Sequence, residues 1–299
     1  MSSTLLSRRD LRFLLYEWLD APRLTERPRY AEHSRETFDD VLDLAERVAA
    51  EHFAPHNRAA DTSEPTVEGG RVRTIPQVKA ALDVFSRTGL LAATMDSSVG
   101  GMQLPHVVSA AAFGYLQAAN VGTSAYPFLT VGNANLLLAH GSAAQVDTFV
   151  RPMVQGRFFG TMCLSEPQAG SSLADITTRA EPQDDGSHRL FGTKMWISGG
   201  DHELAENIVH LVLARIPGGP PGVKGISRSS CRRCWSAPTA CPARATTWCW
   251  SASTTRWATG GPPTPCSTSA RGCTGRTAGP GRSATWWGSP TRAWRRCST

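Results

Sequence analysis

The last quarter of the chain lacks most of the residues that build a protein core. Residues 227–299 contain no Leu, Ile, Val, Phe or Met, and no Asp, Glu, Lys, His, Asn, Gln or Tyr. Without large aliphatic side chains this tail cannot bury enough apolar surface to offset the entropy of ordering, so we expect it to be disordered. The tail holds a CxxC at Cys231 and Cys234, but neither His nor a second CxxC that would complete a zinc site. We therefore predict no metal site.

The eight residue types that the tail does use are Ser, Arg, Cys, Trp, Ala, Pro, Thr and Gly. They are the complete set encoded by codons whose middle base is G or C. Such a set arises when a GC-rich gene is read one base out of frame. We infer that the reading frame is lost near Ser227; a natural low-complexity basic tail is the alternative.

Charge divides the chain at the same place. The tail has 11 Arg and no acid, which leaves 20 Lys and Arg against 25 Asp and Glu in residues 1–226. The net charge of +6 therefore belongs to the tail. An Arg- and Trp-rich segment could bind nucleic acid through phosphates and stacked bases, and a binding protein of this kind is our alternative function. The codon set argues against it, so we expect no nucleic-acid partner.

Cysteine is scarce before the tail, where Cys163 stands alone. This usage fits a reducing cytoplasm, with Cys163 as a small buried residue of a strand. The first 20 residues do not read as a secretory signal, and no apolar run approaches the length of a membrane span. We expect a cytoplasmic protein.

Hydrophobic periodicity predicts helices in the first half of the chain, at residues 7–20, 34–53, 76–88, 105–119, 123–140 and 143–154. Residues 64–73 are expected to form a polar loop. His106 and His140 end helices without a paired carboxylate nearby, so we expect caps or surface residues rather than acid–base groups.

After Gly156 the period changes to that of strands, at residues 158–164 and 207–215. Helices followed by strands predict segregated α+β domains, and no G-x-G-x-x-G follows a strand to indicate a dinucleotide fold. We divide the chain into an extension helix (1–33), a helical domain (34–157), an incomplete, barrel-like β domain (158–226) and the tail (227–299).

The densest pattern lies in residues 161–172, TMCLSEPQAGSS, and residues 194–200, KMWISGG. A DDG turn at 184–186 predicts a β-hairpin between them. Ala169 and Gly170 would let the main chain approach a planar ligand closely, and Ser hydroxyls would bind it. Spacing alone also allows an ordinary surface loop beside a hairpin.

L-S-E-P-x-A-G-S-S followed by K-M-W-I-S resembles the flavin-binding signature of the acyl-CoA dehydrogenase family. The run LRFLLYEWLD at residues 11–20 resembles an extension in the branch that includes methylthiopropanoyl-CoA dehydrogenases. The resemblance implies FAD held between a β domain and a C-terminal four-helix bundle. It also implies an acyl-CoA substrate, an electron-transfer acceptor, and a homo-oligomer at full length.

The same resemblance implies the site residues. The cofactor would be bound by residues of the two motif segments: Met162, Leu164, Ser165, Ser171, Trp196 and Ser198. Glu166 would order the loop rather than act as the base. The family's catalytic glutamate comes from the C-terminal bundle, which this frame does not encode, so no catalytic residue is assigned and the product is expected to be truncated and inactive.

One run of the tail supports the frame hypothesis. Residues 254–266, TTRWATGGPPTPC, have possible codons whose shifted frame reads NHKMGYRGTTNTL. Members of the family carry a similar K-M-G-x-R-G run in the second half of the middle domain. A single added or removed base should then open a frame that encodes the missing helices.

Overall fold

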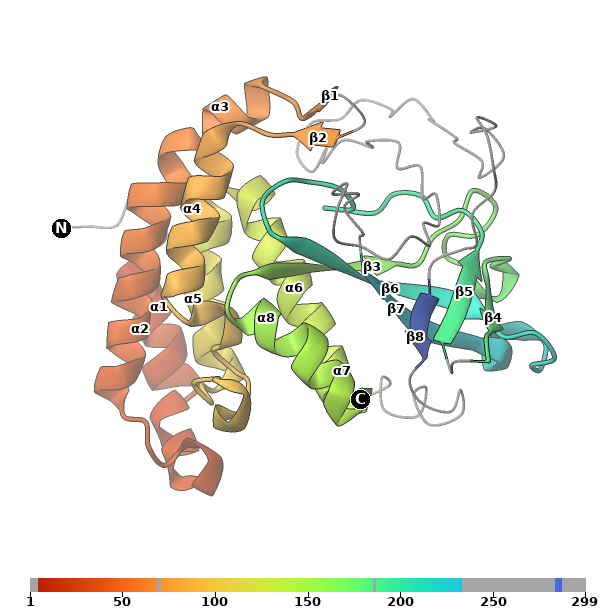
Figure 1. The fold of residues 1–299 in the computed structure, drawn as a ribbon. Helices are drawn as coiled ribbons and strands as arrows, with labels where there is room; N and C mark the ends of the chain where they lie inside the picture. Colours follow the sequence, from red (N-terminus) through yellow and green to blue (C-terminus); the bar gives the residue numbers. More distant parts are fainter. Residues whose placement is uncertain (1–4, 69–70, 185–186, 233–282, 287–299) are drawn as a thin grey trace.

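The computed structural model describes residues 5–68, 71–184, 187–232 and 283–286, with a helical part first and a sheet second (Figure 1). The helices of these ranges are α1 (Arg8–Arg12), α2 (Arg35–Val48), α3 (Asn57–Thr62), α4 (Pro76–Arg87), α5 (His106–Ala119), α6 (Val121–His140), α7 (Ala143–Gln145) and α8 (Arg151–Val154). The strands are β1 (Thr66–Glu68), β2 (Arg71–Arg73), β3 (Phe158–Cys163), β4 (Arg179–Pro182), β5 (Ser187–Phe191), β6 (Asn207–Arg215), β7 (Ile226–Arg232) and β8 (Ser283–Trp286). The predicted α+β class is confirmed.

Helix α2 begins where its sequence predicts. The Ser34 hydroxyl accepts a hydrogen bond from the Thr37 N–H at 3.3 Å, and the Thr37 hydroxyl accepts from the Ser34 N–H at 2.6 Å. This reciprocal cap satisfies two donors that the first turn leaves open. A wider turn, Ala49–Phe53, then extends the helix to Pro55. Its predicted apolar face is buried throughout: Phe38, Val41, Leu42, Ala45, Val48, Ala49 and Phe53.

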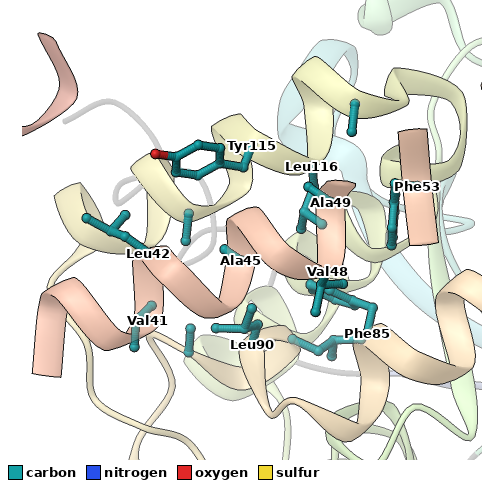
Figure 2. Packing of buried hydrophobic residues seen from close by; sticks show 14 of the residues in the cluster. Val41, Leu42, Ala45, Val48, Ala49, Phe53, Phe85, Leu90, Tyr115 and Leu116 are labelled. Carbon is teal, nitrogen blue, oxygen red and sulfur yellow. The ribbon is translucent and has the colours of Figure 1, made fainter. Parts of the chain in front are cut away.

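The core of the helical part lies between α2, α4 and α5 (Figure 2). The rings of Phe53 and Phe85 meet edge to face with centroids 6.3 Å apart, and Phe85 meets Phe113 in the same way at 5.8 Å. Each fully buried side chain of this size stabilises the fold by about 1.5–3 kcal/mol through apolar surface removed from water. Helix α4 ends at Arg87, and Gly89, the residue type expected just past a helix end, adopts a positive φ of 77°.

The sheet closes on β6. β6 pairs with β4, β4 with β5, β5 with β8, β8 with β7, and β7 again with β6, while β3 adds a parallel strand outside this ring. The predicted hairpin is formed by β4 and β5, which pair Arg179 with Phe191. Because β6 has neighbours on both edges, seven of its nine residues are buried. The described strands thus close into a ring through β8, whereas we expected an incomplete, barrel-like domain that ends at residue 226.

Helix α6 fastens the helical part to the sheet. The Thr130 hydroxyl accepts from the Gly160 N–H at 3.0 Å, and the Asn133 side chain donates to carbonyl oxygens of both β3 and β6. A Cβ at Gly160 would lie 2.5 Å from the Asn133 Cβ, so only glycine allows this approach. β3 therefore leaves the helical part at a fixed position, and the loop after it carries the predicted site.

The extension differs from the prediction. The sequence S-R-R-D from Ser7 and the spacing of the apolar residues predict a capped helix with one packed face, made of Leu11, Leu14, Leu15, Trp18 and Leu19. The Ser7 cap is present, but only Leu15 of these five is buried, and Leu14, Trp18 and Leu19 are 40%, 69% and 48% exposed. The segment Phe13–Trp18 is a π-helix, in which each hydrogen bond spans five residues instead of four. This wider turn rotates later side chains off the expected face. Leu15 and Leu11 still pack on the core cluster, and polar contacts with α2 add to them, including Arg8 with Glu46 at 2.6 Å.

Two further segments differ. The expected polar loop at 64–73 contains the β1–β2 hairpin, which pairs Thr66 with Arg73. β7 continues the sheet to Arg232, past the predicted boundary at residue 226, and β8 also lies within the segment expected to be disordered. Both gain order from backbone pairing with β6 and β5, which needs no large side chain. Residues 233–282 and 287–299 of the predicted tail lie outside the described residues.

Candidate functional site

Two separate segments meet to form the site. The loop at residues 162–171 leaves the end of β3, and residues 194–200 follow β5. The Met195 N–H donates to the Ser165 carbonyl oxygen at 3.0 Å, and the Lys194 ammonium donates to the Leu164 carbonyl oxygen at 3.0 Å. The two motifs singled out in the sequence therefore lie side by side.

The loop folds back on itself at its Pro. The Glu166 N–H donates to the Ala169 carbonyl oxygen at 2.8 Å, and the Ala169 N–H donates to the Glu166 carbonyl oxygen at 3.0 Å. Ala169 is buried against Ile176 and Leu213, so its small size serves core packing rather than the ligand approach that we predicted. Gly170 is exposed, and a Cβ added there would meet nothing within 4 Å.

The Glu166 carboxylate lies at the centre of this loop and forms an ion pair with Lys194. Each of the two side chains is only 1% exposed. Lys194 donates to its Oε1 at 2.8 Å, and the Thr178 N–H donates to the same atom at 3.0 Å. The Thr177 N–H and hydroxyl donate to Oε2 at 2.7 and 2.9 Å, and Gln168 Nε2 donates at 2.7 Å. The predicted loop-ordering role of Glu166 agrees with these contacts.

Opposing effects set the ionisation of the pair. Burial alone would raise the pKa of Glu166, but the hydrogen bonds from Lys194, Thr177 and Thr178 and the charge of Lys194 together lower it to about 2. Burial lowers the pKa of Lys194, and its hydrogen bond to Glu166 and the carboxylate charge oppose that effect. Glu166 is thus a carboxylate at neutral pH and a poor proton acceptor.

Trp196 has the most unusual backbone of the site. Its φ is 60°, a left-handed value that is costly for a bulky residue, and its side chain is 48% exposed. Flanking hydrogen bonds hold this conformation, from Met195 N–H to Ser165 and from Gly200 N–H to the Ile197 carbonyl oxygen at 3.2 Å. The Trp196 ring is therefore held half exposed on a strained backbone, where it is accessible to a ligand.

The other predicted site residues differ in burial. Ser165 and Ser198 are half-buried, and Ser171 is exposed. Met162 and Leu164 are also half-buried, and each contacts a hydrophobic cluster. Met162, in β3, packs on the cluster that contains Val209, and Leu164 packs on the cluster that contains Ala169. The structure brings Ser165 next to the segment that carries Trp196 and Ser198.

Sequence reasoning missed two residues of the site. Lys194 stood in a quoted motif, and a lone Lys ahead of the apolar M-W-I run was a usable signal of a buried ion pair. Arg215 ends the apolar strand β6 and donates to the carbonyl oxygens of Ile176 at 2.8 Å, Gly222 at 3.1 Å, and Ala174. Arg215 thus holds the segment that follows the loop, at Ala174 and Ile176, and the sequence alone does not indicate this contact.

Two further titratable residues were considered in the sequence. His106 is exposed at the start of α5, and Cys163 is a buried thiol at the end of β3. Within residues 5–68, 71–184, 187–232 and 283–286, no three His, Cys, Asp or Glu side chains gather as metal ligands. Across the same ranges, no helix has the length and apolar character needed to span a bilayer.

A helical part is joined to a sheet, and two adjoining segments carry a buried ion pair and a half-exposed Trp. Comparison with known proteins identifies the class that has this arrangement. Residues 35–157 match the family described as acyl-CoA dehydrogenase, N-terminal domain. The chain belongs to the acyl-CoA dehydrogenase family, as its motifs predicted.

Among its relatives, 3-methylmercaptopropionyl-CoA dehydrogenase of Ruegeria pomeroyi is 38% identical over 219 residues, 73% of this chain and 37% of that protein. This chain therefore spans little more than a third of that relative. Butyryl-CoA dehydrogenase from Megasphaera elsdenii has a similar fold, with a TM-score of 0.55 and 24% identity over 67% of this chain and 49% of that one. An acyl-CoA dehydrogenase complexed with FAD from Bacillus anthracis gives 0.54 and 20%, over 67% and 31%.

Proposed function

We propose that this chain derives from an FAD-dependent enzyme that removes two hydrogens from the α and β carbons of an acyl-CoA thioester. The observation that carries the proposal is the 3.0 Å hydrogen bond from the Met195 N–H to the Ser165 carbonyl oxygen, because it unites the two halves of the flavin motif. Membership of the family and the FAD complex of one structural neighbour support it.

The residues present fit a flavin. The Trp196 ring is half exposed and available for packing against a planar ring system, and open space surrounds Gly170. Ser165, Ser198 and Ser171 offer hydroxyls, and Met162 and Leu164 give the loop an apolar side. Bound FAD would accept the β hydride, while these residues would orient the ring and hydrogen-bond its polar edge.

A general base is the part that the described residues do not supply. Removing an α proton needs a base whose pKa lies near the working pH. Glu166 does not qualify, since both of its oxygens already accept hydrogen bonds and its pKa is about 2. We propose that the base is encoded by the frame that is lost near Ser227, so that the chain as given is inactive.

Partners and compartment follow from the same proposal. A reduced flavin must pass its electrons on, which requires an electron-transfer acceptor. A site that is open on one side is completed either by a further domain or by a second subunit, so we propose a homo-oligomer for the frame-restored protein. The buried thiol of Cys163 forms no disulfide, which is compatible with a reducing cytoplasm.

FAD titration tests the proposal. Two proteins are compared by flavin fluorescence and by visible absorbance: the 299-residue chain, and a frame-restored version made by adding or removing one base near codon 227. We expect weak binding by the first protein and a yellow second protein that bleaches with acyl-CoA. In the frame-restored protein, Ser165→Ala and Trp196→Ala should each weaken FAD binding about tenfold, which is the effect of losing one hydrogen bond or one ring contact. His106→Ala, at an exposed position, is the control.

Two results would contradict this reading. A frame-restored protein that stays colourless with FAD supplied would refute the function. Gene sequencing that finds no family-like continuation in either other frame would refute the frame hypothesis. The nucleic-acid alternative makes its own prediction, a salt-sensitive affinity for nucleic acid that is lost when residues 227–299 are deleted and is tighter than a bare cationic tail provides.

A further inference from the structure

The ion pair of Lys194 and Glu166 is almost completely buried. Both side chains are 1% exposed and the Nζ–Oε1 distance is 2.8 Å. Two buried charges lose their hydration, and a well-packed apolar pair of similar volume is often as stable or more so. The stability of the fold alone therefore does not explain this pair, and the residues that the pair connects offer an explanation.

Its contacts converge on the residues assigned to the cofactor. Lys194 binds the carbonyl oxygen of Leu164 and the carboxylate of Glu166, the two neighbours of Ser165. The next residue, Met195, binds the carbonyl oxygen of Ser165 itself. Consecutive residues of one segment thus hold three consecutive residues of the other.

Trp196 follows directly on this double attachment. Its φ of 60° is strained, and strain of this kind persists only where neighbouring contacts fix the backbone. The Lys194 and Met195 contacts are the ones immediately before it in the chain. Without the Lys194 contacts, the hydrogen bond from the Met195 N–H to the Ser165 carbonyl oxygen would have to hold the backbone before Trp196.

We propose that Lys194 and Glu166 are positioning residues, a buried clamp that sets the Ser165 hydroxyl and the Trp196 ring relative to each other for the flavin. This inference rests on the proposed function, since it needs a flavin at Ser165 and Trp196. The clamp does not touch the reacting atoms. It acts through the backbone of the residues that bind the cofactor.

Two variants distinguish an effect of the pair on stability from an effect on the position of the cofactor-binding residues. Lys194→Met keeps the length of the side chain but leaves a buried carboxylate without its cation, so it should lower both stability and FAD affinity. The double variant Lys194→Met with Glu166→Gln is neutral and should unfold within about 0.5 M urea of the unchanged chain. If the pair acts only on stability, the double variant should recover FAD binding.

We expect that it does not recover. FAD affinity of the double variant should stay at least about tenfold below that of the unchanged sequence in the frame-restored protein. Lys79→Met is the matched control, because Lys79 forms an exposed pair with Asp83 at the same 2.8 Å. A double variant that is stable and binds FAD normally would overturn the clamp, while Ser165→Ala and Trp196→Ala would still weaken binding and uphold the proposed function.

A measurement without FAD judges the clamp even if the proposed function fails. In the 299-residue chain, hydrogen exchange of the Met195 amide reports the link to Ser165 directly. We expect this amide to exchange at least about tenfold faster in the double variant, and at an unchanged rate in Lys79→Met. Unchanged exchange in the double variant would overturn the clamp.

Discussion

The side-chain amide of Asn133 in helix α6 lies 3.0 Å from the carbonyl oxygen of Thr161 in strand β3. The same amide donates to the carbonyl oxygen of Val209 in β6 at 2.8 Å, and Asn133 is completely buried. One side chain thus joins the helical part to two parallel strands, immediately before the loop that carries the predicted site.

Replacing Asn133 should therefore be costly. Asn133→Ala removes both donors and leaves a cavity and two buried carbonyl oxygens short of a partner, so we expect a loss of about 2–4 kcal/mol in the free energy of unfolding. Urea unfolding followed by far-UV circular dichroism measures it. Phe128→Ala on the same helix is the control, because Phe128 is 59% exposed. Equal effects of the two variants would contradict the fastening role of Asn133.

Two glycines of the site should respond in opposite ways to alanine. Gly192 has a φ of 150°, and a Cβ there would lie 2.3 Å from the Thr178 hydroxyl oxygen and 2.7 Å from the Thr178 Cα. Thr178 also donates its N–H to Glu166, so Gly192→Ala should lower the free energy of unfolding by about 2 kcal/mol or more and disturb the loop.

Gly170→Ala is the matched comparison. It has no neighbour within 4 Å of the added Cβ and no positive φ, so its effect on stability should stay within about 0.5 kcal/mol. Thermal unfolding of the two variants side by side makes the comparison. A large loss in Gly170→Ala would mean that the loop packs differently from the structure.

Much of the helical part could be predicted because local signals agreed with the fold. Ser34 and Thr37 cap α2, and Gly89 ends α4, as their residue types require. Glu166 was predicted to order its loop, and it does. The pairing of Glu166 with Lys194, 28 residues away, could not be predicted, because it depends on the path of the hairpin between them.

The extension shows the opposite case, in which a clear pattern misled. The apolar spacing of residues 11–19 indicated one packed face, but the choice of face is made by tertiary contacts. Tyr16 donates its hydroxyl proton to Asp39 at 3.0 Å, Arg8 pairs with Glu46, and Leu15 lies in the core cluster, so the docked side combines polar contacts with a buried leucine. Nothing in the periodicity indicates that these polar contacts belong to the docked side.

This orientation predicts a contrast within the extension. Leu15→Ala should cost about 2–4 kcal/mol in the free energy of unfolding, because Leu15 is 2% exposed within the core cluster. Trp18→Ala should change stability by less than about 0.5 kcal/mol, since Trp18 is 69% exposed. Urea unfolding of both variants decides. A large loss in Trp18→Ala would restore the packed face that periodicity indicated.

The last prediction concerns acid stability and Glu166. Its pKa is about 2 in the fold, against an ordinary value of 4.5, because the folded protein stabilises the carboxylate. A depressed carboxyl pKa contributes stability above the unfolded value and loses it as pH falls from about 4.5 towards 2. Burial lowers the pKa of Lys194, and its hydrogen bond to the Glu166 carboxylate opposes that effect. The shift corresponds to about 3 kcal/mol.

The measurement is the free energy of unfolding by urea at pH 6, 5, 4 and 3. The unchanged chain is compared with the Glu166→Gln and Lys194→Met double variant, which lacks this titration. Asp96 and Glu206 also have lowered pKa values, but they are common to both proteins and cancel in the difference. We expect the difference to be constant from pH 6 to 5 and then to fall as the pH is lowered to 3. A difference that does not change with pH would show that Glu166 is not held as a buried carboxylate.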